Sequence, residues 1–119
     1  MEVRNREQAE AFTTLDGSTI RVLLDAVVGG AREQSLAEAS LPAGGSTQRH
    51  YHARTEEIYV LLEGSGEMDV EGDRRQVVPG DAILIPAGAW HEIRANGDGG
   101  VRFLCCCAPP YSDGDTFFE

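Results

Sequence analysis

The sequence predicts an all-β domain folded as a sandwich or barrel. Short runs rich in β-branched and aromatic residues recur at spacings of about 8–12 residues, and glycine or proline separates them. With 119 residues the chain can bury a modest core without disulfides, and neither a repeat nor a linker divides it. We therefore predict one domain over residues 1–119.

The N-terminal part predicts few regular elements. The apolar residues of 1–14 follow no period, so we expect a loosely attached arm there. Asp16 and Gly17 predict a turn. Residues 1–33 are together expected to form a short arm, irregular or helical, and the first elements of the fold.

Residues 18–24 fit two patterns. Their apolar residues form either a helical stripe or the alternation of a strand: Ile20, Leu23, Leu24 and Val27 in the first case, and Ile20, Val22 and Leu24 in the second. Ser18 would cap the helix. We favour a short helical turn.

Residues 34–110 carry the clear strand signals. The predicted strands are, in order, QSLAEASL, EIYVLLEG, GEMDV, RRQVV, DAILIP, HEIRAN and VRFLCCCA. Residues 71–73, Glu-Gly-Asp, predict a hairpin turn between the third and the fourth. Residues 111–119 are predicted to form a C-terminal tail.

The charge of the chain excludes several classes of function. Twenty acidic residues against ten basic ones give a net charge of −10, which disfavours nucleic acids and anionic membranes as partners. All ten basic residues are arginine, so no lysine amine is present for Schiff-base or pyridoxal-phosphate chemistry.

The N-terminus and the cysteines predict a cytoplasmic protein. Charged residues occupy the first positions, where a signal peptide needs an apolar core, and no run is long enough to span a membrane. Cys105, Cys106 and Cys107 are adjacent and odd in number, which argues against a disulfide framework. We expect them to be buried thiols in a strand.

The histidines are the strongest functional signal. His50 and His52 are two residues apart, so in a strand both project from the same face. Glu57 follows at the start of the next strand, and His91, the third histidine, opens the HEIRAN strand. Imidazole and carboxylate are typical ligands of divalent transition metals. On spacing alone, surface histidines on a polar strand are an equally good interpretation.

The flanking residues resemble the first motif of the cupin superfamily. Gly44, His50, His52, Glu57 and Gly64 stand in its order, with five, four and six residues in the intervals before His50, before Glu57 and before Gly64. Glu56 also satisfies a loose form of this spacing. Glu57 shares strand parity with Tyr59, which would face the interior, so Glu57 is assigned as the ligand and Glu56 as a solvated acid.

A second stretch resembles the second cupin motif. Gly80 is followed after five residues by Pro86-Ala87-Gly88 and, two residues later, by His91. The sequence departs from the pattern at Ala95, where the family often has asparagine; here the asparagine is Asn96. The resemblance covers residues 44–96 in detail and is similar to small single-domain, conserved-barrel cupins.

This resemblance implies a fold and a metal site. Cupins are double-stranded β-helices, that is, jelly-roll barrels whose open mouth holds a small ligand. The ligands implied are His50, His52, Glu57 and His91, holding one divalent ion per chain: Fe, Mn, Ni, Co or Zn. The sequence does not choose among these metals.

Four more residues are candidates for substrate contact. Arg54 would point into the cavity if its strand continues, or lie on the surface in a turn. Tyr59 would offer a phenol inside the barrel or pack in the core. Trp90 would stack on a substrate or cover a dimer contact, and Tyr111 would fold over the mouth.

The resemblance leaves two functions open. The first is a metal-dependent isomerase, decarboxylase or other lyase, or dioxygenase that acts on a small oxygenated metabolite such as a sugar or keto acid. The alternative is a non-catalytic metallo-binding or sensing module for a small molecule. Similarity to small cupins also implies a homodimer, with the arm and QSLAEASL as interface elements because open sheet edges need covering.

Overall fold

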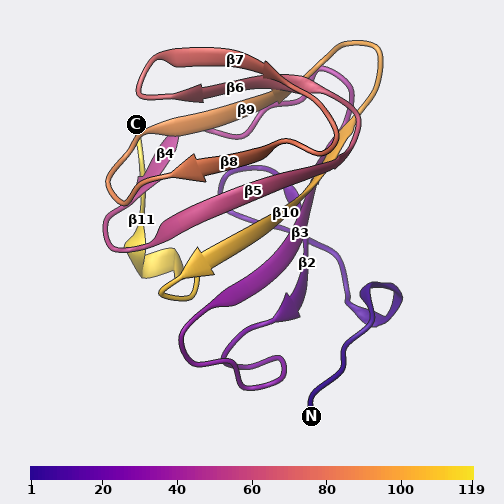
Figure 1. The fold of residues 1–119 in the computed structure, drawn as a ribbon, viewed down its shortest axis with the longest axis vertical. Coiled ribbons are helices and arrows are strands. Elements are labelled where there is room, and N and C mark those ends of the chain that lie inside the picture. Colours follow the sequence, from indigo (N-terminus) through magenta and orange to yellow (C-terminus); the bar gives the residue numbers. More distant parts are fainter.

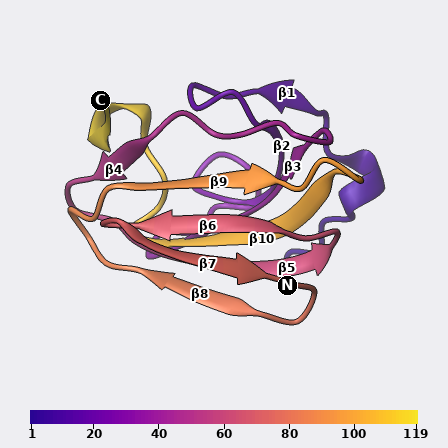
Figure 2. The same ribbon diagram turned by 90° about the horizontal axis from the view of Figure 1, so that it is seen from above.

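The computed structural model describes all 119 residues and confirms the jelly-roll prediction: two antiparallel sheets packed face to face (Figure 1, Figure 2). The six-stranded sheet contains, in spatial order, β1 (Phe12–Thr13), β2 (Thr19–Leu24), β3 (Ser35–Leu41), β10 (Val101–Ala108), β5 (Glu56–Glu63) and β8 (Ala82–Ile85). The five-stranded sheet contains β11 (Thr116–Phe118), β4 (His50–His52), β9 (His91–Ala95), β6 (Gly66–Val70) and β7 (Asp73–Val77).

Two 3-10 turns complete the secondary structure, η1 (Arg6–Gln8) and η2 (Asp113–Asp115). Neither approaches the length and hydrophobicity that a membrane-spanning helix requires. All the strands that we predicted between residues 34 and 110 are present, with β6 and β7 joined by the predicted hairpin at residues 71–73.

The core lies between the sheets and follows from the alternation of the strands. On β5, Tyr59 and Leu61 face inward and are buried, whereas Ile58, which precedes Tyr59, faces outward and is exposed. Leu61 meets Phe103 across the sheet, and both belong to the same cluster as Ile93 of the opposite sheet. This packed part of the barrel holds the strands that carry the site in a fixed register.

The first motif ends on glycine for a steric reason. Gly64 closes β5 with a φ of +72°, a region that favours glycine. A Cβ at this position would also overlap the carbonyl of Gly100, which precedes β10. Gly64 therefore lets the loops that follow β5 and precede β10 pass close together.

The prediction of a helical turn at residues 18–24 is wrong. This segment is β2, paired with β3, and the alternating interpretation holds, because Ile20 and Val22 line the space between the sheets. Ser18 does not cap a helix: its backbone N–H and its hydroxyl both donate to Asp16 Oδ1, which closes the turn before β2.

The expectation of a loose N-terminal arm is also wrong in part. Arg6 in η1 donates from Nε to Glu38 Oε2 at 2.7 Å, and Arg102 donates to the same oxygen at 3.1 Å. Arg21 reaches back to the carbonyl of Ala9. Glu38 projects from the outer face of β3, so the arm is fastened across that face.

Segments outside the predicted barrel range of 34–110 contribute strands to both sheets. β2 extends the six-stranded sheet, and the C-terminal tail adds β11 beside β4, as the yellow strand in Figure 1 shows. QSLAEASL, expected to offer an open edge, is β3 and lies between β2 and β10. Its edges are therefore covered within the chain, and the homodimer stays a prediction.

Glu38 makes stability depend on pH in a calculable direction. Burial raises the pKa of Glu38, but the hydrogen bonds from Arg6 and Arg102 outweigh it and lower the pKa below 4.5. A carboxyl with a lowered folded-state pKa stabilises the protein above the unfolded value, and this contribution disappears as pH falls through the folded pKa.

We expect Glu38→Gln to lower the free energy of unfolding by about 1–3 kcal/mol near neutral pH, because two guanidinium groups lose their charged acceptor. Below pH 4.5 the difference from the wild type should shrink, and it should disappear once the pH has passed the lowered pKa, since Glu38 is then protonated in the folded protein too. Urea unfolding of the wild type and the variant, near neutral pH and in acid below pH 4.5, measures this difference in the free energy of unfolding. A difference that persists undiminished in acid would contradict the assignment.

Candidate metal centre

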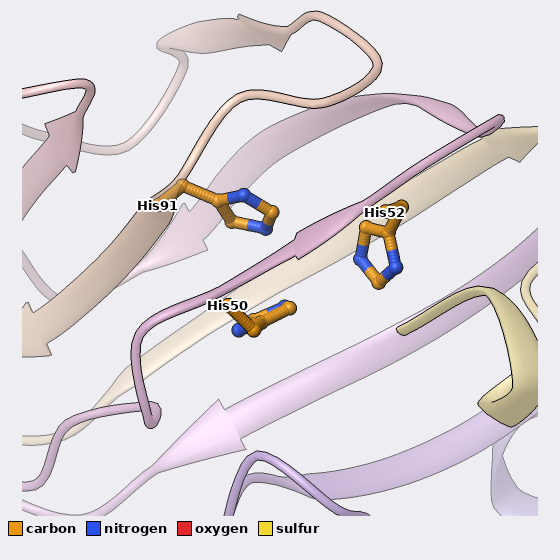
Figure 3. A group of neighbouring side chains, drawn as sticks. All are labelled: His50, His52 and His91. Carbon is orange, nitrogen blue, oxygen red and sulfur yellow. The ribbon is translucent and has the colours of Figure 1, made fainter. Parts of the chain in front are cut away.

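Three buried histidines meet at one place in the barrel. His50 and His52 lie on β4, and His91 begins β9, directly opposite His50 in the sheet register. One nitrogen of each ring lies within 4.8 Å of those of the other two rings. Figure 3 shows the three imidazoles turned toward the same space.

A short turn sets the position of His91. Pro86 to Ala89 close it through the Ala89 N–H to Pro86 carbonyl bond, and Gly88 adopts a φ of +81° that favours glycine. The Gly88 N–H also donates to the carbonyl of His52 at 2.7 Å. This bond holds the turn against β4, so His91 enters β9 next to the other two histidines.

Each imidazole is held through its outer nitrogen. His50 Nδ1 lies 2.7 Å from the carbonyl of Gln48, and His91 Nδ1 lies 2.9 Å from that of Ala89. Because a carbonyl only accepts, both Nδ1 atoms carry the ring proton. The Nε2 atoms of these rings keep their lone pairs.

The same argument applies to His52. Its Nδ1 lies 3.1 Å from Thr116 Oγ1 on β11. The Thr116 hydroxyl donates its own proton to the carbonyl of Ser112 at 2.9 Å, so toward His52 it accepts. All three rings are therefore in the tautomer that leaves Nε2 free to bind a cation.

Glu57 faces two of these nitrogens. Its Oε1 lies 3.3 Å from His52 Nε2 and 3.4 Å from His91 Nε2. Both Glu57 Oε1 and His91 Nε2 are fully buried without a hydrogen-bond partner. A carboxylate oxygen and two imidazole lone pairs face one another, all of them acceptors, so a cation between them satisfies the group.

The ionisation of these groups suits a cation. Burial raises the pKa of Glu57, whereas protons on the Nε2 atoms of His52 and His91 would outweigh burial and lower it to about 2; with these Nε2 atoms unprotonated, a bound cation would take that role. Burial and the neighbouring His91 lower the pKa of His50, which favours its neutral form. Carboxylate and neutral imidazole are the forms that bind metals.

Glu57 has a further partner on β10. Cys107 pairs with Glu57 in the sheet register, and its Sγ lies 3.2 Å from Glu57 Oε2. Burial and the charge of Glu57 raise the pKa of the Cys107 thiol, so it stays protonated and donates to the carboxylate. One oxygen of Glu57 is thus held by the thiol while the other faces the histidines.

The histidine cluster borders a cavity of about 580 Å³ at the N-terminal side of the barrel. His50, His52 and Glu57 form one wall, and apolar residues of β2 and β3 and the β1–β2 turn form much of the rest, among them Leu15, Ile20, Val22, Leu36, Ala37 and Ala39. Its size suits a small organic molecule.

The structure separates the four predicted substrate contacts into two pairs. Tyr59 and Tyr111 line the cavity, and the ring of Tyr111 lies 5.7 Å from that of His52. Burial raises the pKa of Tyr111 to about 12. Tyr59 also belongs to the buried core cluster, and contact of either tyrosine with a substrate stays a prediction.

Arg54 and Trp90 lie elsewhere. β4 ends at His52, so the parity on which the Arg54 prediction depended does not continue; Arg54 is exposed, and its backbone N–H donates to Asp115. Trp90 packs edge-on against Tyr51, with ring centroids 4.6 Å apart, and does not line the cavity.

Several residues at the site escaped the sequence reasoning. Thr116 and Cys107 support His52 and Glu57, and Asp16 lines the cavity with Oδ2 3.9 Å from His50 Nε2. For the thiols a sequence signal was available: Cys105 and Cys107 are two residues apart on β10, so they lie on the same face of that strand. Asp16 was predicted only as a turn residue and Thr116 lies in the predicted tail, and no periodicity in either segment pointed inward.

Comparisons with known proteins agree with this geometry. The cupin domain family matches residues 37–107, more than half of the chain. The uncharacterized protein MJ1618 of Methanocaldococcus jannaschii is 42% identical over 110 residues, which cover 92% of this chain and 88% of that protein.

Two relatives carry names that refer to chemistry. Polyketide synthase CurC of Streptomyces cyaneus is 29% identical over 78% of this chain, which spans only 60% of that protein. The structure of the polyketide cyclase RemF from Streptomyces resistomycificus is 27% identical, with a TM-score of 0.80 over 97% of this chain and 89% of that one. On fold, motifs and sequence together, the chain belongs to the cupin domain family.

Proposed function

We propose that this protein is a metal-dependent enzyme that acts on a small oxygenated molecule bound in the cavity. The observation that carries the proposal is the set of buried acceptors, in which Glu57 Oε1 faces the Nε2 atoms of His52 and His91 with no donor between them. His50, His52, His91 and Glu57 would hold one divalent transition ion. When bound, such an ion supplies a Lewis acid that polarises an oxygen of the bound molecule.

The chain's own groups would then have distinct tasks. The carbonyls of Gln48 and Ala89 and the Thr116 hydroxyl keep the Nδ1 protons of the histidines away from the cavity. Cys107 holds one oxygen of Glu57. The apolar residues of β2 and β3 exclude water from the other side of the bound molecule. This division of roles supports isomerisation, elimination or oxidative cleavage, and the cyclase name of RemF adds cyclisation.

A non-catalytic module that captures or senses a small molecule through its metal is the alternative. The three-histidine cluster and the cavity serve it equally well. The two functions differ in whether the bound molecule is changed.

The metal centre is tested by elemental analysis of protein purified without a histidine tag. We expect one equivalent of a divalent transition metal in the wild type and loss of most of it in His52→Ala, because removing one of four ligands weakens the site severely. Arg54→Ala is the matched control, since Arg54 is exposed two residues away and outside the cavity. Unchanged occupancy in His52→Ala would rule out this ligand set.

Cys107 offers a test of how Glu57 is held. We expect Cys107→Ala to weaken metal binding by about tenfold, because Glu57 Oε2 loses its buried donor. Cys107→Ser, which keeps a donor, should retain affinity closer to that of the wild type. Competition with a chelating dye measures both. Equal affinities for the two variants would show that the thiol only fills space.

Turnover separates the enzyme from the binding module. The metal-loaded protein is incubated with panels of neutral and acidic oxygenated metabolites, and products are sought by mass spectrometry. An enzyme should lose product formation on chelation and regain it with one particular metal. Ligand-induced thermal stabilisation without any product would instead establish the binding module.

A further inference from the structure

We infer that the cavity selects a neutral molecule carrying a hydroxyl group, and that Asp16 is the residue that makes this selection. The inference builds on the proposed function, because it concerns what binds beside the histidine cluster. It concerns a residue of the β1–β2 turn that neither cupin motif contains.

The turn holds Asp16 firmly beside the cluster. The Asp16 carbonyl accepts from the Gln48 N–H at 2.8 Å, and the Gln48 carbonyl in turn holds His50 Nδ1. Within the side chain, Oδ1 accepts from the backbone N–H of Ser18 at 2.9 Å and from its hydroxyl at 2.6 Å. Ser18 is 1% exposed, so these bonds are sheltered from water.

The second oxygen lies beside His50, which also lines the cavity. Asp16 lines the cavity, and its Oδ2 lies 3.9 Å from His50 Nε2, beyond hydrogen-bond range. With His50 Nδ1 already protonated, Nε2 has no proton to donate to this oxygen. Oδ2 is therefore positioned as an acceptor for a group that enters beside His50, and a hydroxyl is a suitable donor.

The other carboxylates of the cavity have different partners from Asp16. Glu57 faces His52 and His91, Asp25 Oδ1 accepts from two amides of its own turn, and Asp113 Oδ1 accepts from the Tyr111 hydroxyl. Asp25 and Asp113 each keep a second oxygen, as Asp16 does, but of these three only Asp16 comes close to a histidine nitrogen, with Oδ2 3.9 Å from His50 Nε2.

The charge balance disfavours an anionic substrate. The cavity lining contains four carboxylates, Asp16, Asp25, Glu57 and Asp113, and no arginine. The charges of Glu57 and Asp16 alone offset those of a divalent cation, so no net positive charge remains to attract a carboxylate or phosphate. Several arginines form ion pairs away from the cavity: Arg6 and Arg102 with Glu38, Arg49 and Arg74 with Asp69, and Arg75 with Asp73. Arg54 is exposed and does not line the cavity.

Two isosteric probes isolate charge from shape. Salicylamide and salicylate share a phenolic hydroxyl and nearly the same outline, but near neutral pH only salicylate is an anion. Binding of each to zinc-loaded protein is measured by calorimetry, because zinc undergoes no redox chemistry that would consume the probe. We expect the wild type to bind salicylamide at least about tenfold more tightly than salicylate.

Asp16→Asn should change the two affinities in opposite directions. Salicylate should bind more tightly because a repelling charge is gone, and salicylamide more weakly because its charged acceptor is gone; a loss of folding cannot produce this pair of changes. Ser18→Ala, which removes one of the bonds to Asp16 Oδ1, should shift the ratio in the same direction by a smaller factor. Asp98→Asn, an equal change in net charge at an exposed position, should leave both affinities unaltered.

The inference fails if the wild type binds salicylate as tightly as salicylamide, if Asp16→Asn and Ser18→Ala both leave the ratio unchanged, or if neither probe binds. The metal content of the same samples reports on the proposed metal centre independently. If the protein retains its zinc yet gives one of these results, the metal centre is supported and only the proposed selectivity for a neutral ligand is contradicted.

Discussion

Buried acceptors that face one another without a donor are the constraint on which the rest of this structure depends. A carboxylate oxygen of Glu57 lies 3.3–3.4 Å from the Nε2 atoms of His52 and His91, deep inside a barrel that water does not reach freely. Burying such groups is costly unless a positive charge lies among them. The surrounding hydrogen bonds, from the Gln48 and Ala89 carbonyls to the Cys107 thiol, all keep the acceptors in this arrangement.

The two ends of the barrel divide stability from chemistry. Leu61, Ile85 and Ile93 pack between the sheets, are at most 1% exposed and do not line the cavity, whereas residues of β2, β3 and β4 do. The free energy gained from burying apolar side chains in this core offsets the unfavourable free energy of burying the acceptor groups of the histidine cluster. A bound cation would stabilise the folded state further, since the unfolded chain has no assembled site.

The sequence predicted most of the barrel because the relevant signals are local. Period-two alternation located β3, β5, β6 and β8 to β10, and parity on β5 correctly placed Glu57 inward and Glu56 outward. The segment at β2 was misassigned because its apolar residues satisfy two periods at once, and only pairing with β3 decides between them. Local sequence patterns do not show which strand a segment will pair with.

The residues of the site also divide into those that local sequence patterns reveal and those that only the complete fold brings together. The three histidines and Glu57 were visible through motif spacing, whereas Thr116 and Asp16 come close to them only after the chain ends have joined the two sheets. For Arg54 the sequence left the cavity and the surface open, and the structure decides for the surface because the strand stops at His52. The candidate ligands are thus readable from the sequence, and the groups that orient them are not.

The last strand gives the C-terminus an influence on the centre of the barrel. β11 carries Thr116, whose hydroxyl fixes the tautomer of His52, and three residues later the backbone N–H of Glu119 donates to the carbonyl of Arg49. A peptide fused after Glu119 would continue directly from this strand, so the fusion point would lie next to the contacts that orient His52. Met1, by contrast, is fully exposed, so a purification handle attached there leaves the docking of the final strand undisturbed.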